Sequence, residues 1–215
     1  MKLKMNGKYI AIPSQYNEDK KLVEFLFENN AIPNFVSEPV GYAYQDDMCR
    51  ALIVESSVPE EATLLAAGEE VAKKSALSEI SESQCLLEVR FGETKKKLPF
   101  AYSIVKIFVV AEDGKTPRGV SYTLNLNIQF PQYYGYINAN FSECGATGMR
   151  ESIVNLMIDG LIGKDNLKNE FYSPYKTKKK NAGIHISERE AWDSFIPKHP
   201  LSQLRKMIRF IIDNN

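Results

Sequence analysis

Strict alternation of apolar and polar residues predicts a sheet in the middle of the chain. Over residues 121–130 the two sets interleave: Tyr122, Leu124, Leu126, Ile128 and Phe130 against Ser121, Thr123, Asn125, Asn127 and Gln129. A period of two places the sets on opposite faces, as in an antiparallel strand that is buried on one side. Residues 85–91 alternate too, and residues 102–110 and 133–141 are rich in β-branched and aromatic side chains, so these runs predict a meander of about four strands.

The N-terminal part of the chain predicts further strands and a helix. Residues 8–12 form a short strand in this interpretation, and residues 35–44 and 48–55 pair with each other. The helix begins after Asn17, which acts as its N-cap, and ends before Pro33.

Helical spacing of apolar residues and helix-start residues predict two more helices. An alanine-rich helix starts at Pro59 and continues to about residue 75. It passes through Gly68, which costs about 1 kcal/mol relative to alanine in a helix interior. Another helix begins at Met149 and ends at Gly163.

The C-terminal part combines a long loop with helical segments. Residues 163–186 show little periodicity, and a loop of this length is functional or mobile. A capping box at residues 187–190 predicts a short helix, and Pro200 opens the last helix. We expect residues 187–215 to form a helical segment that packs on the rest of the domain.

Strand pairs followed by helices, without regular βαβ alternation, indicate an α+β fold with a mainly antiparallel sheet flanked by helices, like an α/β sandwich. The order of elements resembles that of PsbP-like domains, whose antiparallel sheets are also flanked by helices. This resemblance implies the arrangement and no function. With 215 residues, 44% of them hydrophobic, residues 1–215 are expected to form a single domain.

Charge and hydropathy exclude several classes of partner. The 27 basic and 27 acidic residues cancel, so no long-range field attracts nucleic acid or an anionic membrane. The longest apolar run, residues 104–111, is too short to span a bilayer, and the N-terminal residues lack the apolar segment of a secretory signal. The lysine-rich run at residues 176–180 is interpreted as a solvated loop. We expect no membrane partner, and nucleic acid is disfavoured.

Cysteine and histidine usage argues against a metal site. Cys49, Cys85 and Cys144 are widely spaced, and the chain has only two histidines, His185 and His199. Neither a Walker loop nor a Rossmann glycine pattern is present. We therefore expect no metal and no cofactor, and reduced thiols in a cytoplasmic protein.

The first candidate site is a loop between a predicted strand and a predicted helix. It contains Cys144, Gly145, Thr147, Gly148 and Arg150. A thiolate, backbone N–H groups freed by glycine, a helix N-terminus and a guanidinium all favour a bound oxyanion.

The spacing of Cys144 and Arg150 resembles the phosphate loop of cysteine-dependent phosphatases. The resemblance implies a nucleophilic thiolate, an anion clamp and, in Asp113, a general acid. Glu143 departs from that pattern, because its charge repels phosphate and raises the pKa of the thiol. Glu151 also departs from it. The favoured interpretation is that Thr147 and Gly148 cap a core helix and that Cys144 is a small buried residue.

The two histidines have structural interpretations. His185 is an alternative general base for Cys144, but its position between Ile184 and Ile186 favours the polar face of a short strand. His199 precedes Pro200 at a helix entry and is interpreted as a capping or surface residue.

The second candidate site is the polar row of Asn125, Asn127 and Gln129. These side chains either line a ligand groove or face solvent, and the pattern favours the solvated face. Taken together, the sequence predicts an intracellular binding or interaction domain for an unknown protein or small-molecule ligand, without chemistry of its own. The alternative is a thiol-dependent hydrolase centred on Cys144.

Overall fold

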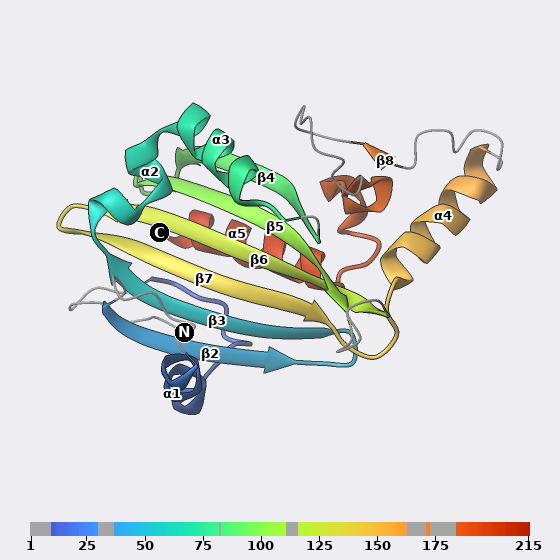
Figure 1. Ribbon diagram of the computed structural model, residues 1–215, viewed down its shortest axis with the longest axis horizontal. Helices are drawn as coiled ribbons and strands as arrows, with labels where there is room; N and C mark the ends of the chain where they lie inside the picture. The colour runs from blue at the N-terminus through green and yellow to red at the C-terminus, as the bar shows by residue number, and fades with distance from the viewer. Residues whose placement is uncertain (1–9, 30–36, 82, 111–115, 163–170, 173–183) are drawn as a thin grey trace.

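The computed structural model describes residues 10–29, 37–81, 83–110, 116–162, 171–172 and 184–215. Within these residues a seven-stranded antiparallel sheet has the strand order β1-β2-β3-β7-β6-β5-β4 (Figure 1). Its strands are β1 (Asn17–Glu18), β2 (Ser37–Gln45), β3 (Cys49–Val58), β4 (Gln84–Glu93), β5 (Pro99–Val110), β6 (Pro117–Phe130) and β7 (Tyr133–Glu143). The predicted α+β class, with an antiparallel sheet flanked by helices, is confirmed.

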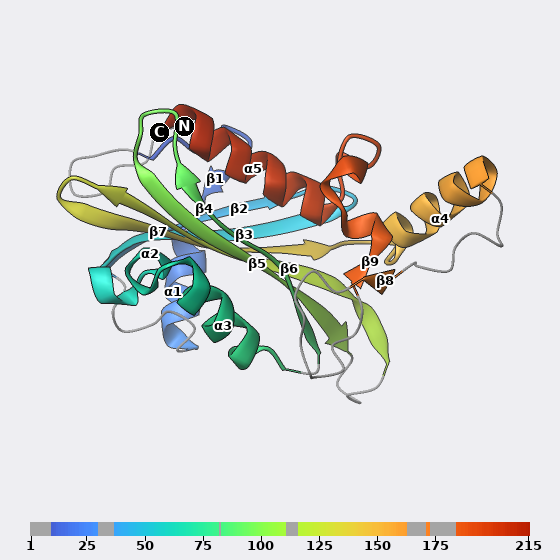
Figure 2. The ribbon, with the colours of Figure 1, turned by 90° about the horizontal axis from the view of Figure 1, so that it is seen from above.

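Helices cover both faces of the sheet. The α-helices among the described residues are α1 (Lys20–Glu28), α2 (Leu64–Ala67), α3 (Glu69–Glu79), α4 (Met149–Ile162) and α5 (Pro200–Asn214). Short 3-10 turns are η1 (Glu60–Ala62), η3 (Ile186–Glu188) and η4 (Glu190–Trp192), and β8 (Phe171–Tyr172) pairs with β9 (Ile184–His185). Figure 2 shows α5 on one face of the sheet, α1, α2 and α3 on the other, and α4 projecting beyond the strand ends.

The main core lies between the sheet and α5. The alternation in β6 is confirmed, because its apolar set is buried: Tyr122, Leu124, Leu126 and Ile128 are at most 1% exposed. The apolar stripe of α5 meets this face through Leu201, Leu204, Met207, Ile208 and Ile211. Burying one stripe of a helix on one face of a sheet leaves the opposite face of the sheet to the other helices.

The connection between β3 and β4 determines what lies on that opposite face. β3 is near the middle of the sheet, between β2 and β7, whereas β4 is at the edge beyond β5. The chain therefore crosses the sheet through η1, α2 and α3 before β4 begins (Figure 2). A second apolar cluster, with Ile80, Leu86 and Val89 at its centre, fixes α3 over β4 and β5.

The predicted helix from Pro59 to about residue 75 is wrong as a continuous helix. Gly68 has φ 73° and ψ 160°, and it ends α2 and begins α3. An L-residue rarely adopts a positive φ, so the glycine at this position marks a break rather than a weak helix interior. Thr63 caps α2 with a side chain that accepts a hydrogen bond from the Ala66 backbone N–H at 3.2 Å.

Three other predictions differ from the structure. The helix expected from the capping box at residues 187–190 is replaced by η3 and η4. The first helix is capped by Asp19, whose carboxylate accepts from the Leu22 backbone N–H at 3.2 Å, while Asn17 belongs to β1. Of the predicted strand at residues 8–12, residues 8 and 9 lie outside the described part, and Ala11 makes an isolated bridge.

Candidate functional site

Glu143, the last residue of β7, holds the loop that leads into α4. Its Oε1 accepts from the Gly148 backbone N–H at 3.2 Å, and its Oε2 accepts from the Val120 backbone N–H at 3.1 Å. Its side chain is only 3% exposed, and its Oε1 lies 3.4 Å from Nε2 of His199. A protein carboxylate therefore already occupies the helix N-terminus that the oxyanion hypothesis assigns to a ligand.

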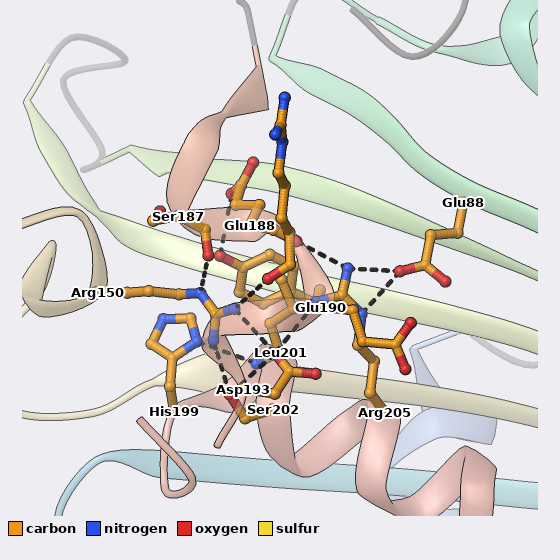
Figure 3. A network of polar contacts seen from close by, with 12 residues as sticks. Glu88, Arg150, Ser187, Glu188, Glu190, Asp193, His199, Leu201, Ser202 and Arg205 are labelled. Carbon is orange, nitrogen blue, oxygen red and sulfur yellow. Dashed lines mark hydrogen bonds and ion pairs between the residues drawn. The ribbon is translucent and has the colours of Figure 1, made fainter. Parts of the chain in front are cut away.

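The guanidinium of Arg150 is fully buried, and other parts of the protein accept its hydrogen bonds (Figure 3). Nε donates to the Ser187 carbonyl at 2.7 Å, and Nη1 donates to the Ser202 hydroxyl at 2.7 Å. Nη2 donates to Asp193 at 2.8 Å and to the Arg189 carbonyl at 3.3 Å. Arg150 thus ties the start of α4 to η3, η4 and α5.

The other members of this loop lie nearer the surface. Cys144 is partly exposed, and its backbone N–H donates to the Met48 carbonyl at 3.0 Å. Gly145 and Gly148 have φ values of 67° and 71°, which shape the turn. Thr147 is exposed and packs on Gly119, where an added Cβ would lie 2.8 Å from the Thr147 methyl carbon. Asp113 lies outside the described residues.

Arg150 is one member of a larger buried charge network (Figure 3). Asp193 also accepts from Arg205 at 3.2 Å, and Arg205 donates to Glu88 at 2.7 Å. On the same side of the sheet, Lys106 forms ion pairs with Glu188 and Glu151.

Opposite charges within this network shift the pKa values of its members. Burial alone lowers the pKa of Lys106, but Glu188 and Glu151 outweigh it and raise the pKa above its ordinary value. Burial raises the pKa of Glu188, although Lys106 opposes that shift. Such paired groups attach the C-terminal segment to the sheet, which is a structural role.

Each of the two histidines caps a helical element, His185 the short turn η3 and His199 the helix α5. The prediction for His199 is confirmed, because its Nδ1 accepts from the Leu201 backbone N–H at 3.2 Å at the start of α5. Burial lowers the pKa of His199. His185 does end a short strand, but it is only 4% exposed rather than solvated, and its Nδ1 accepts from the Ser187 backbone N–H at 3.1 Å.

The polar row of β6 borders a groove on the face of the sheet opposite α5. The groove has a volume of about 450 Å³ and lies between α2 and α3 on one side and β5, β6 and β7 on the other. Its floor comprises the polar residues Ser103, Thr123, Asn125, Asn127 and Tyr136 together with the aliphatic residues Val105 and Ile107 of β5. Its wall includes Leu64, Ala72, Ala76 and Ile80. The structure thus brings Asn125 and Asn127 together in one hollow. Gln129, further along β6, is exposed and lies outside this lining.

Asn127 is the most distinctive residue of the groove. Its side chain is 1% exposed, and its Oδ1 accepts from the Leu64 backbone N–H at 2.9 Å, which fixes the orientation of the amide. Its Nδ2 is buried and has no hydrogen-bond partner among the described residues. Because an unsatisfied buried donor costs about 1–3 kcal/mol, this position favours a bound acceptor.

Hydrogen bonds across β6 and β7 orient the rest of the floor. Oδ1 of Asn125 accepts from the Tyr136 hydroxyl and from Nδ2 of Asn138, each at 2.8 Å. This places Oδ1 on the β7 side and leaves the Asn125 amide nitrogen directed away from β7. Nδ2 of Asn140 donates to Thr123 at 3.3 Å. The part of the floor formed by β6 and β7 is therefore an ordered array of uncharged polar groups.

The groove carries almost no formal charge. Glu79 is its one charged lining residue among those described, and it is exposed and accepts from the Ser75 hydroxyl at 2.9 Å. Apart from Ser75 and Glu79, the wall formed by α2 and α3 is aliphatic. A hollow with an apolar wall and a few oriented polar groups has the usual composition of a small-ligand site.

The β7 side and the helical wall of the groove were not predicted from the sequence. Residues 134–142 alternate as clearly as β6, with Tyr136, Asn138 and Asn140 on the polar face, so their pattern could have identified them. The helical wall gave no such signal. Ala72 and Ala76 face the groove only because the chain crosses the sheet at this point, and that crossing is a property of the topology.

A larger hollow of about 750 Å³ lies where α1 meets β2 and β3. It is lined by charged residues of both signs, among them Glu18, Lys21 and Arg50. None of its described lining residues is a buried polar group without a partner. This hollow therefore lacks the feature that singles out the groove beside α3.

Comparison with known proteins returned neither a matching family model nor a matching curated protein. Across the described residues no cluster of three or more His, Cys, Asp or Glu side chains is arranged to hold a metal ion. No helix in the described part of the chain has the length and apolar character needed to cross a membrane. The groove and the loop before α4 thus have to be interpreted from their own geometry.

Proposed function

We propose that this protein is a non-enzymatic binding domain whose ligand occupies the groove between α2–α3 and the polar floor of the sheet. Asn127 carries this proposal. Its buried Nδ2 is without a partner among the described residues, while its Oδ1 is fixed by the Leu64 backbone. A ligand acceptor at this point would satisfy a donor that is otherwise costly to bury.

An intracellular setting is part of the same proposal. Cys49, Cys85 and Cys144 are not joined in a disulfide bond in the described structure, and the first two are buried. Cysteines in the thiol form are consistent with a reducing compartment.

A fragment screen observed by NMR tests the proposed site without assuming the ligand. Isotope-labelled protein would be mixed with small neutral and charged fragments, and the side-chain amide signals of Asn125 and Asn127 would be followed. The expected result is a set of hits that shift these signals. The proposal fails if hits collect at the hollow beside α1, or if no fragment shifts the Asn127 signal.

Two tryptophan variants of α3 control this screen. Ala76→Trp fills the groove, because Ala76 lines its wall, and should abolish the shifts. Val71→Trp lies on the outer side of α3, where Val71 is 58% exposed, and should leave them unchanged. Equal responses of both variants would place the hits outside the groove.

The alternative function, a thiol-dependent hydrolase at Cys144, stays a prediction. It requires Arg150 to leave its buried partners and the Gly148 amide to leave Glu143. A hydrolase would show rapid iodoacetamide labelling of Cys144 near neutral pH and protection by phosphate. If Cys144 is labelled slowly and phosphate does not change the labelling rate, the binding function is supported over the hydrolase.

A further inference from the structure

We propose that the groove binds an extended peptide segment and recognises its main chain through the side-chain amides of Asn125 and Asn127. This inference rests on the proposed function, because it names the ligand class of the same site. The floor can recognise a peptide only through side chains, since the backbone groups of β6 are paired with β5 and β7 along the groove.

The spacing of the amides fits an extended chain. Asn125 and Asn127 are alternate residues of one strand and share a face. The distance between them along the strand is therefore about 6.6–6.8 Å, which is twice the rise per residue. Carbonyl groups that point the same way along an extended peptide repeat at the same interval. From Thr123 to Asn127 the lining of β6 covers four residue steps, about 13 Å, which matches roughly four residues of an extended ligand.

The chemistry of the two amides also suits peptide carbonyls. The Asn127 oxygen is used by the Leu64 backbone, and the Asn125 oxygen is used by Tyr136 and Asn138. Both residues therefore offer Nδ2, a donor, on the side away from those partners. A row of neutral donors matches the acceptor oxygens of a peptide main chain.

The helical wall and the low charge of the groove determine which side chains a bound peptide can carry. Alternate side chains of an extended ligand would face Ala72, Ala76 and Ile80, which favours small or aliphatic residues there. A charged side chain at these positions would lose hydration without a counter-charge. The one carboxylate, Glu79, lies at the exposed rim.

A phage-displayed library of random heptapeptides provides the probe. The library would be selected on the whole protein, and the selected peptides would be synthesised with capped ends and measured by fluorescence polarisation. We expect uncharged peptides that bind the wild type and Val71→Trp equally and bind Ala76→Trp at least tenfold more weakly. Selection of peptides that bind Ala76→Trp as well as the wild type would overturn the inference.

The role of the Asn127 donor has its own test. Asn127→Asp keeps an acceptor for the Leu64 backbone but replaces the free donor with a carboxylate oxygen. Loss of one such hydrogen bond corresponds to about a 3- to 10-fold weaker dissociation constant. Unchanged affinity in a variant that gives a folded NMR spectrum would contradict the inference.

A main-chain ester scan of the selected peptide leaves the protein untouched. Each peptide bond in turn is replaced by an ester, whose carbonyl is a weaker acceptor. Recognition by Asn125 and Asn127 predicts that sensitive positions are separated by two residues. A uniform response along the peptide would overturn the proposal.

The peptide inference and the proposed function can fail separately. If fragments shift the Asn127 signal but the library gives no groove-dependent peptide, the groove binds another class of ligand and the inference is wrong. If fragments and peptides both fail to bind the groove, the proposed function is wrong as well.

Discussion

At the residue scale, Glu55 is the most unusual ionisable group of the core. It is fully buried on β3, and neither carboxylate oxygen has a hydrogen-bond partner among the described residues. Burial raises its pKa from 4.5 to about 9, so the folded protein holds this carboxyl in its neutral form at pH 7.

Glu55→Gln should change how stability depends on pH. The unfolded carboxyl ionises near pH 4.5 and the folded one near pH 9, so its favourable contribution is complete below pH 4.5 and is lost as pH rises to about 9. The variant should therefore gain stability relative to the wild type between pH 5 and pH 9, as measured by urea unfolding. Glu24→Gln, on the exposed side of α1, is the control. A difference from the wild type that does not vary with pH would show that Glu55 is ionised in the folded protein.

Individual residues could be assigned to a face from the sequence, but their partners could not. Alternation placed Asn125 and Asn127 on the polar face, because a strand has a fixed period of two. It could not show that Asn127 is covered by the start of α2, 63 positions away along the chain. Arg150 is the opposite case. The spacing of Arg150 from Cys144 resembles that of an anion-binding loop. In the structure, however, the acceptors of its hydrogen bonds lie 37 to 52 positions away along the chain.

At the element scale, Gly68 interrupts the helical segment and separates α2 from α3. Its backbone conformation is one that L side chains rarely adopt, and among the described residues only its chain neighbours lie within 4 Å of the place where a Cβ would be. A substitution there tests backbone strain alone, without a steric clash.

Gly68→Ala and Gly160→Ala should have opposite effects. Gly68→Ala should destabilise the protein by about 1–3 kcal/mol through strain. Gly160 lies inside α4 with open space at its Cβ position, and alanine there should stabilise the helix by up to about 1 kcal/mol. Urea unfolding of both variants measures the difference. A loss of stability in Gly160→Ala, or none in Gly68→Ala, would contradict this account of the break.

Boundaries of elements were predicted where a local signal dominates and missed where it does not. His199 and Pro200 mark the start of α5 in both the sequence and the structure, since capping is a local interaction. The sequence predicts one short helix where the structure has the turns η3 and η4. In η3 the carbonyls of Ser187 and Glu188 accept hydrogen bonds from the buried side chains of Arg150 and Arg205. No local pattern contains that information.

At the scale of the whole molecule, the buried charge network joins the C-terminal segment to the sheet. Arg150→Met should leave Asp193 with one fewer counter-charge and free the carbonyls of Ser187 and Arg189. Removing one partner of a buried ion pair costs about 3–5 kcal/mol. Lys198→Met is the control, because Lys198 is 59% exposed and its pair with Asp47 is worth about 0–1 kcal/mol. If thermal or urea unfolding shows similar losses of stability in both variants, the charge network is not what holds the C-terminal segment on the sheet.

The topology also explains where the candidate site lies. The chain must cross from β3 to the edge strand β4, and the crossing helices stand over the polar face that β5, β6 and β7 present. A continuous apolar face would have allowed the helices to pack tightly across the whole sheet. The polar rows of β6 and β7 instead leave a groove beside α3.

Diffraction from crystals soaked with N-methylacetamide and phosphate together would test the central claim most directly. N-methylacetamide is a single peptide bond, and phosphate is the anion that the loop before α4 would hold in a phosphatase-like enzyme. The account predicts the amide in the groove, with its carbonyl oxygen about 2.9 Å from Nδ2 of Asn127, and Glu143 still bonded to the Gly148 amide. Phosphate ordered against the backbone of residues 144–148, with Arg150 released to it and the groove empty, would contradict it.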